Sequence, residues 1–182
     1  FDEERFVERR YGVRAFDAAI DGWIERHRSP VLDRAMYTLS STADHSLLWF
    51  TIGGVRALRR NDLRFAIRFG AAIGLESAFT NGAVKALFRR VRPEPEIAEG
   101  PLPYGMRRPI TSSFPSGHAT AAFTAASILA RTGRGDAAWY TLAGVVAGSR
   151  VYVRMHHASD VVVGAAIGLA FGAALKRFFP AA

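Results

Sequence analysis

The sequence predicts an all-α protein, a membrane-embedded helical bundle of about six core helices with an amphipathic helix in front of them. Nowhere do apolar and polar residues alternate as they do in a half-buried strand. Hydrophobic residues make up 49% of the 182 residues and collect in long stretches that turn-forming residues separate. The later stretches are rich in glycine and alanine, which let neighbouring helices approach closely, as in many membrane proteins.

The boundaries of the expected helices follow from breaker residues. Pro30 suits the first turn of a helix, where the backbone N–H has no intrahelical partner. Asn61 and Asp62 favour a break between helices, and so do residues 132–135. In chain order the expected helices are Val13–His27, Pro30–Ala43, His45–Arg59, Leu63–Arg90, Gly117–Arg131, Ala137–Val153 and Asp160–Phe179.

The length predicts a single domain over residues 1–182. Within it we expect amphipathic helices in residues 1–44, a helical core in residues 45–179 and a proline-rich loop over residues 93–114. A loop of that length inside a compact domain is usually functional or disordered, and we favour a functional one because phosphate-binding residue types flank it.

The first helix carries apolar residues at helical spacing. Phe16, Ile20, Trp23 and Ile24 fall on one side, and acidic residues lie elsewhere. Such a helix could rest on a membrane surface or pack against the bundle, and the pattern does not separate the two.

Charge and composition narrow the function. The net charge of +8 predicts an anionic partner, which could be nucleic acid, an anionic membrane surface or a phosphorylated substrate. The absence of cysteine excludes disulfides, thiolate metal sites and cysteine nucleophiles. No uncharged apolar segment reaches the length of a typical membrane span, and the longest is Val161–Leu175. An alanine-rich soluble bundle therefore stays an alternative.

Basic residues flank the start of the proline-rich loop. Lys85 and Arg92 stand seven positions apart, which places both on one face of a helix, and Pro93 follows. Two cations on one face can bind one anion together. Basic residues near a helix end also commonly serve only the helix dipole.

The end of the loop carries a second candidate. Ser116, Gly117 and His118 stand where the prolines give way to an apolar helix. Free N–H groups at a helix N-terminus bind anions, and a glycine lets an oxygen approach the backbone. An ordinary serine cap beside a surface histidine is the alternative.

A third candidate precedes the last helix. Ser149 and Arg150 are followed by His156 and then by Asp160, four residues further on, which is within hydrogen-bond reach if a helix runs through both. A carboxylate on one ring nitrogen fixes the histidine tautomer and leaves the other nitrogen free as a nucleophile. His157 competes for this role, with a poorer spacing to Asp160.

Together the three candidates resemble the signature of the type 2 phosphatidic acid phosphatase family, which is related to vanadium haloperoxidases and bacterial acid phosphatases. The signature reads Lys-x6-Arg-Pro, Pro-Ser-Gly-His and Ser-Arg-x5-His-x3-Asp, and every defined position is present in order. The resemblance covers residues 60–175, and the first 44 residues add little to it.

The resemblance implies a role for each residue. His156 attacks phosphorus and becomes a phosphohistidine, and Asp160 orients it. His118 protonates the leaving oxygen and then activates water. The phosphate-binding residues it implies are Lys85, Arg92, Ser116, Gly117 and Arg150.

The resemblance also implies a lipid phosphatase of the membrane, acting on a lipid phosphate or polyprenyl (di)phosphate. Arginine and lysine can stabilise a transferring phosphoryl group, so we expect no metal and no cofactor. We also expect no nucleic acid partner, because a basic binding module would not need histidine and aspartate at these spacings. A soluble acid phosphatase, a vanadate-binding haloperoxidase and a non-catalytic lipid-binding or nucleic-acid-binding protein are the alternatives.

Basic residues predict the orientation in a bacterial inner membrane. An up-and-down path places three basic clusters on one side, which the positive-inside rule assigns to the cytoplasm. The three signature parts then lie on the periplasmic or outer side. The clusters are Arg56, Arg59, Arg60, Arg64 and Arg68, then Arg131 and Arg134, then Lys176 and Arg177.

Overall fold

The computed structural model describes residues 3–94, 109–131 and 136–179, and all regular structure in these residues is helical. This confirms the all-α prediction. The elements are α1 (Glu3–Arg26), α2 (Pro30–Thr42), the short 3-10 helix η1 (Asp44–Ser46), α3 (Leu47–Arg60), α4 (Leu63–Ser77), the π-helix η2 (Ala78–Val84), α5 (Gly117–Arg131), α6 (Asp136–Tyr152), α7 (Ala158–Leu175) and the 3-10 helix η4 (Lys176–Phe178).

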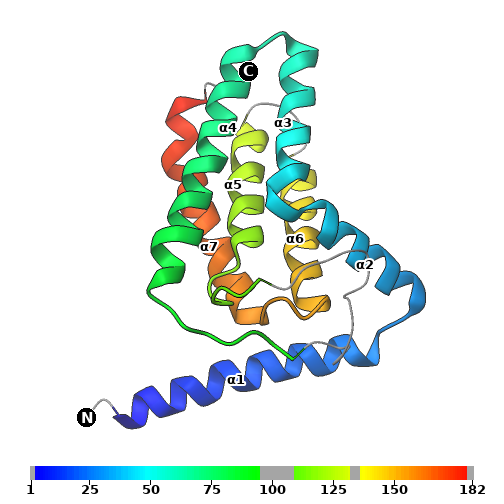
Figure 1. The fold of residues 1–182 in the computed structure, drawn as a ribbon, viewed down its shortest axis with the longest axis vertical. Coiled ribbons are helices and arrows are strands. Elements are labelled where there is room, and N and C mark those ends of the chain that lie inside the picture. The colour runs from blue at the N-terminus through cyan, green and yellow to red at the C-terminus, as the bar shows by residue number, and fades with distance from the viewer. Residues whose placement is uncertain (1–2, 95–108, 132–135, 180–182) are drawn as a thin grey trace.

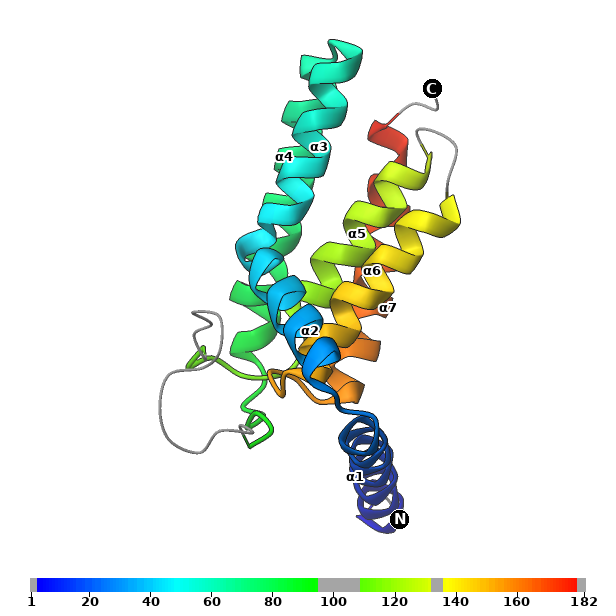
Figure 2. The same ribbon diagram turned by 90° about the vertical axis from the view of Figure 1, so that its right-hand side faces the viewer.

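Helices α3 to α7 run roughly along the long axis of the molecule, α2 lies obliquely to it, and α1 crosses one end of the bundle (Figure 1). α2 leads through η1 into α3, and α3 and α4 form a long hairpin beside α5, α6 and α7 (Figure 2). α3 ends at Asn61, which adopts a left-handed conformation, and Asp62 caps α4 by accepting a hydrogen bond from Phe65 N at 2.9 Å. Asparagine tolerates that conformation, which explains the predicted break.

Three glycines in α7 allow α7 to press against α5. Gly164, Gly168 and Gly172 are buried and stand one turn apart. A Cβ at Gly168 would lie 2.4 Å from the backbone oxygen of Thr120, closer than real Cβ atoms come to a backbone oxygen. The glycine and alanine content that predicted close helix packing therefore serves this contact.

The end of α4 differs from the predicted helix Leu63–Arg90. The helix passes into η2 and stops near Lys85, where Leu87 N and Phe88 N bond carbonyls only three residues back. The backbone of Arg90 then pairs with the 109–115 segment, because its carbonyl accepts from Ser113 N at 2.9 Å. Pairing with that segment replaces further helix. The described part of the predicted proline-rich loop is residues 93–94 and 109–114, and residues 95–108 lie outside the described chain.

The face that α1 turns to the bundle is only part of the predicted apolar side. Asp17 and Ile24 are buried, whereas Phe16 and Trp23 are 44% and 55% exposed. The predicted apolar side is therefore divided: Ile24 packs on the bundle while two aromatic rings face outward. Arg90 and Ser159 compensate the burial of the Asp17 carboxylate by donating hydrogen bonds to it.

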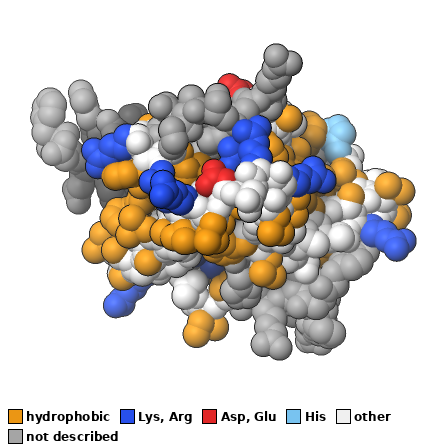
Figure 3. Space-filling model, turned by 90° about the horizontal axis from the view of Figure 1, so that it is seen from above, with side chains coloured by type: hydrophobic (Ala, Val, Ile, Leu, Met, Phe, Trp, Pro, Cys, Tyr) orange, Lys and Arg blue, Asp and Glu red, His pale blue; other side chains and the backbone are white. Residues whose placement is uncertain are grey.

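Basic side chains gather at the end of the bundle opposite α1. Arg59, Arg60, Arg64 and Arg68 are exposed around the α3–α4 turn, and Arg177 follows α7 at the same end. Figure 3 looks onto this end, where Lys and Arg side chains lie among hydrophobic ones. Arg134, which belongs to the second predicted cluster, lies outside the described residues, and the side chains of Arg131 and Lys176 are not described either.

Candidate active site

The three signature parts meet at the α1 end of the bundle (Figure 1). Lys85 follows η2, the N-terminus of α5 carries the second part, and the end of α6 with the turn before α7 carries the third. Arg150 lies within electrostatic range of both His118 and His156, and Lys85 within range of both Arg92 and Arg150. Residues far apart in the chain are thus brought into one charged cluster.

His156 lies buried in the turn between α6 and α7, with 2% of its surface exposed. Its Nδ1 lies 2.7 Å from the carbonyl oxygen of Ser113. A carbonyl only accepts, so Nδ1 carries the proton and Nε2 keeps its lone pair. Burial lowers the pKa of His156 to about 3, and the charges of Arg92 and Arg150 act in the same direction. The ring is therefore neutral at neutral pH, as a nucleophile must be.

Asp160 is fully buried beside His156. Its Oδ2 lies 3.8 Å from His156 Nδ1, which is an ion-pair distance and too long for a hydrogen bond. The predicted hydrogen bond required a helix through both residues, and that helix is absent because α6 stops at Tyr152 and α7 starts at Ala158. Ser113 therefore fixes the tautomer, while Asp160 supplies negative charge to the same side of the ring.

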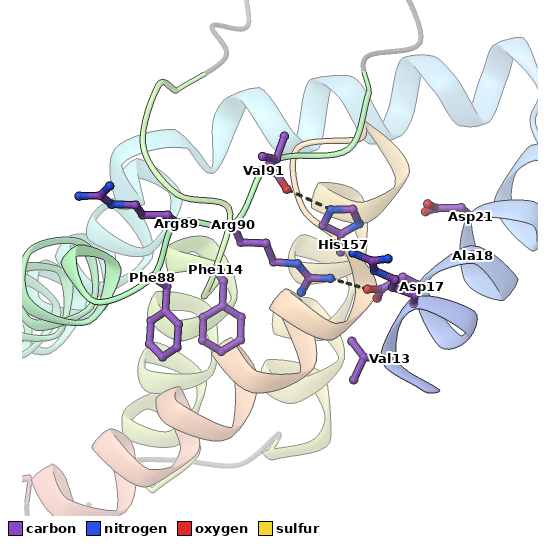
Figure 4. A pocket seen from close by; sticks show the side chains of 11 residues that line it. Val13, Asp17, Ala18, Asp21, Phe88, Arg89, Arg90, Val91, Phe114 and His157 are labelled. Carbon is purple, nitrogen blue, oxygen red and sulfur yellow. Dashed lines mark hydrogen bonds and ion pairs between the residues drawn. The ribbon is translucent and has the colours of Figure 1, made fainter. Parts of the chain in front are cut away.

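His157, the competing histidine, points elsewhere. Its Nε2 bonds the carbonyl of Val91 at 3.2 Å, and it lines a cavity between α1 and the 88–91 segment (Figure 4). His156 is the histidine that faces Arg92, whose Nη1 lies 3.4 Å from Nε2. The geometry thus favours His156.

The two arginines of the signature are both held in place. Arg92 is buried and donates to the carbonyl of Met155 at 2.6 Å. Arg92 does not share a helix face with Lys85, as the sequence suggested, but reaches the site from an extended segment. Arg150 donates to Ser40 Oγ at 2.6 Å, and its buried Nε has no hydrogen-bond partner among the described residues. The Nε–H of Arg150 can therefore donate a hydrogen bond to a bound anion.

The start of α5 follows the predicted pattern. Ser116 is buried, its Oγ accepts a weak hydrogen bond from Ala119 N, and its own N–H donates to the carbonyl of Asp160 at 3.1 Å. A Cβ at Gly117 would lie 2.7 Å from Asn81 Oδ1, so the Asn81 side chain would have to shift to admit a larger residue. α5 therefore begins at the site with its N–H groups directed toward it.

Asp44, in η1, is a site residue that the sequence did not suggest. Its Oδ1 lies 2.8 Å from His118 Nε2 and 3.2 Å from Arg150 Nη1. The contact joins residues 74 positions apart, and Asp44 belongs to none of the three signature parts. No spacing pattern could have indicated it.

The PAP2 superfamily model matches residues 65–182, a range that contains every residue of the signature. The chain belongs to the PAP2 superfamily. This confirms the family resemblance. Asp44 precedes the matched range, so it lies outside the part by which this PAP2 protein is classified.

Curated relatives of this PAP2 chain include two mycobacterial proteins, both named decaprenylphosphoryl-5-phosphoribose phosphatase. The one from Mycobacterium tuberculosis is 33% identical over 139 residues, covering 74% of this chain and 73% of the relative. The one from Mycolicibacterium smegmatis is 34% identical over 130 residues, covering 69% of this chain and 67% of the relative.

Two solved structures share the fold. The transmembrane PAP2-type phosphatidylglycerolphosphate phosphatase from Bacillus subtilis superposes with a TM-score of 0.71 at 24% identity, covering 92% of this chain and 86% of that one. Aquifex aeolicus LpxE superposes with a TM-score of 0.69 at 24% identity, covering 88% of this chain and 94% of that one. The bundle is thus the helical fold of membrane PAP2 proteins.

Proposed function

We propose that this PAP2 protein is a membrane phosphatase that removes phosphate from a lipid phosphate or polyprenyl (di)phosphate through a phosphohistidine. The observation that carries the proposal is the meeting of a neutral, buried His156 with three cationic side chains at one end of the bundle. A cluster of cations in a mostly buried site stabilises a bound phosphate dianion and the charge of its transition state.

In the first step, His156 Nε2 attacks phosphorus as the bond to the leaving oxygen breaks. Burial and Arg150 lower the pKa of His118 to about 4, so His118 is protonated only once the phosphate dianion is bound beside it. The protonated ring then gives that proton to the leaving oxygen, so the alcohol leaves neutral. Negative charge on the transferring group is balanced by Lys85, Arg92 and Arg150, and Asp160 stabilises the positive charge that develops on the His156 ring, 3.8 Å away.

In the second step, His118, now neutral, takes a proton from water. The resulting hydroxide attacks phosphorus of the phosphohistidine, the P–N bond breaks, and inorganic phosphate leaves with His156 restored. His118 acts as an acid and then as a base, which requires one ring nitrogen free for substrate while the other is held by Asp44.

We favour a polyprenyl-linked sugar phosphate as the substrate. Support comes from the mycobacterial relatives, whose names give a decaprenylphosphoryl phosphoribose as their substrate. Phosphatidic acid, phosphatidylglycerol phosphate and polyprenyl diphosphate share the same phosphate chemistry and are the competing substrates.

The surface of the bundle supports a membrane location. Among the described helices, α7 has the length and composition to cross a membrane, with a mean hydropathy of 1.8, yet only 28% of that stretch is buried. A core helix of a water-soluble protein would be mostly buried. Large apolar side chains are exposed along three helices, namely Leu58, Ile67, Leu75, Val162 and Leu169. Exposed apolar side chains of this size are stable in contact with the hydrocarbon of a lipid bilayer and unfavourable in contact with water.

We place the site on the outer side of a bacterial inner membrane. The exposed arginines around the α3–α4 turn lie at the opposite end of the bundle, and basic residues collect on the cytoplasmic side. Phosphate release would then occur outside the cytoplasm.

The test is phosphate release in detergent, with EDTA present, from the four lipid classes named above. Wild type should release phosphate, and His156→Ala should release none above background. His27→Ala is the matched control, because His27 lies at the end of α1, bonded to Trp23 and outside the site. A phosphorylated protein that is stable in base and labile in acid should form in wild type and be absent from His156→Ala.

Equal activity of wild type and His156→Ala would overturn the nucleophile assignment. Activity that EDTA abolishes and a divalent metal restores would overturn the metal-independent mechanism. A wild type that is folded and releases phosphate only from water-soluble esters would overturn the lipid substrate.

A further inference from the structure

A network of short polar contacts connects α1 with the carboxylate of Asp160. Arg90 Nη1 lies 2.6 Å from Asp160 Oδ1, and Arg90 Nη2 lies 2.6 Å from Asp17 Oδ2. Asp17 also accepts from Ser159, at 2.8 Å from the backbone N–H and 2.9 Å from the hydroxyl. Arg90 thus bridges two buried carboxylates, one from α1 and one from the candidate active site.

Both carboxylates of this network, Asp17 and Asp160, are buried away from water. Asp17 is 5% exposed and Asp160 is 0% exposed. A buried carboxylate is costly unless ionic partners and hydrogen bonds compensate it. Here Arg90 and Ser159 supply those partners. Figure 4 shows Arg90 reaching Asp17 beside the cavity that α1 lines.

We infer that Arg90 and Asp17 are positioning residues for the reaction, because together they fix the rotation of the Asp160 carboxylate toward His156. The inference rests on the proposed function. Neither residue belongs to the defined positions of the signature, and neither touches the histidine ring itself.

The division of the Asp160 oxygens gives the physical reason. Oδ1 faces Arg90, while Oδ2 accepts from the backbone N–H of His157 at 2.9 Å and faces His156 Nδ1 at 3.8 Å. One oxygen is held on each side, so the carboxylate plane cannot rotate without losing a charge-assisted bond. Without Arg90, the His157 N–H alone would hold the carboxylate, which could then turn about that bond and move its charge away from the imidazole.

Asp17 acts one step further away. The Arg90 guanidinium presents a planar fork, and a second carboxylate on the other Nη fixes that fork against Asp160. Because Asp17 lies in α1, the helix that crosses the end of the bundle becomes part of the active-site scaffold. Residues of the first 44 thus support the site through Arg90, although they add little to the family resemblance.

The variants are Asp17→Asn, Asp160→Asn and the double variant. Asp17→Asn keeps the shape of the side chain and places a neutral amide against Arg90. We expect kcat to fall by about ten-fold with KM within about two-fold, since supporting contacts commonly contribute this much. Arg90→Lys keeps the charge but loses the fork, and it should show the same split between kcat and KM.

Asp21→Asn is the matched control. Asp21 lies one turn further along α1, lines the same cavity, and pairs at 4.0 Å with Arg154, away from Arg90 and Asp160. The Asp21→Asn substitution removes one negative charge from the same face of α1 that carries Asp17. It should leave kcat within about two-fold of wild type.

Non-additivity is the decisive readout. In the Asp160→Asn background, Asp17→Asn should change kcat by less than about two-fold, because the group it positions has lost its charge. The same ten-fold loss in both backgrounds would overturn the inference and make Asp17 merely structural. So would equal losses for Asp17→Asn and Asp21→Asn.

Thermal unfolding in detergent separates the inference from the proposed function. The proteins compared are wild type, Asp17→Asn, Asp160→Asn and the double variant. Shifts in the midpoint should also be non-additive for Asp17 and Asp160, because Arg90 joins them. A wild type without phosphatase activity would overturn the proposed function, while additive midpoints would overturn the network itself.

Discussion

Oδ1 of Asp44 accepts a hydrogen bond from Nε2 of His118 at 2.8 Å and lies 3.2 Å from Nη1 of Arg150. The candidate active site therefore contains two carboxylate–imidazole pairs: Asp44 is hydrogen-bonded to His118, and Asp160 lies at an ion-pair distance of 3.8 Å from His156. The Asp44 pair fixes which nitrogen of His118 is free for substrate. It also ties the acid–base histidine to a phosphate-binding arginine.

Asp44→Asn should lower kcat by about ten-fold to a hundred-fold. A positioned acid–base group contributes about 10²–10⁴ to the rate, and Asn retains the shape of Asp44 but loses the charge that keeps His118 a good base. Breakdown of the phosphohistidine depends on that base. The phosphorylated protein should therefore accumulate in Asp44→Asn during turnover, as measured by rapid quench with a radiolabelled lipid phosphate.

Asp136→Asn is the control for Asp44→Asn, because Asp136 is exposed in the first turn of α6 at the far end of the bundle. It should behave as wild type. A change in KM alone for Asp44→Asn would contradict the acid–base role and leave only an effect on binding through Arg150.

Much of the fold could be predicted because helix boundaries depend on local chemistry. The structure begins α5 at Gly117 and ends it at Arg131, as the serine cap and the following breaker predicted. The end of α4 could not be predicted in the same way. Residues 87–90 are good helix formers, and it is pairing with the 109–115 segment that removes them from the helix. That pairing is tertiary and leaves no local pattern.

The site shows the same division. Residues such as His156 and Arg150 could be found from the sequence, because the family signature places them at fixed intervals within a short segment. Asp44, Asp17 and Arg90 could not, since their partners lie about 70 or more residues away in the chain. Composition does not distinguish one aspartate from another. Only the fold brings Asp44 to His118, and Asp17 through Arg90 to Asp160.

Acid should destabilise the protein through His156. Burial lowers the pKa of His156 to about 3, below the ordinary histidine value of 6.5. The unfolded chain therefore binds a proton that the folded protein excludes, and the free energy of unfolding falls as pH drops from about 6.5 toward 3. The groups that face the ring are Asp160, Arg92 and Arg150, and the two arginines oppose its protonation.

The measurement is the unfolding midpoint in detergent between pH 7 and pH 4.5. Wild type should lose stability more steeply with falling pH than His156→Gln, whose side chain does not titrate. His27→Gln removes an exposed histidine directly after α1, outside the site, and this variant should follow the wild-type slope. Parallel slopes for all three proteins would show that His156 does not resist protonation.

Gly168→Ala should weaken the contact between α5 and α7. The new methyl group would meet the backbone oxygen of Thr120 at 2.4 Å, and a backbone atom in a helix cannot move aside cheaply. Overpacking of this kind costs about 1–3 kcal/mol of unfolding free energy. Gly144→Ala in α6 is the control, since a Cβ there meets nothing within 4 Å and alanine favours the helix. Equal midpoints for the two variants would contradict the close α5–α7 packing.

Cysteine labelling should place the site on the outer side of the membrane. The chain contains no cysteine, so a single introduced thiol reports without background. Thr111→Cys lies in the exposed segment at the site end, since Thr111 Oγ1 is 3.5 Å from Nη2 of Arg92. In intact cells a membrane-impermeant maleimide should label it.

Arg59→Cys, at the opposite end of the bundle, should be labelled only after the membrane is permeabilised. The reverse pattern would contradict the outward orientation that the basic residues favour. Because Thr111 and Arg92 lie at the same end, the label also reports which compartment receives the phosphate. An outward site requires that its substrate reach the outer leaflet before it is hydrolysed, since a charged phosphate headgroup does not cross the hydrocarbon core unaided.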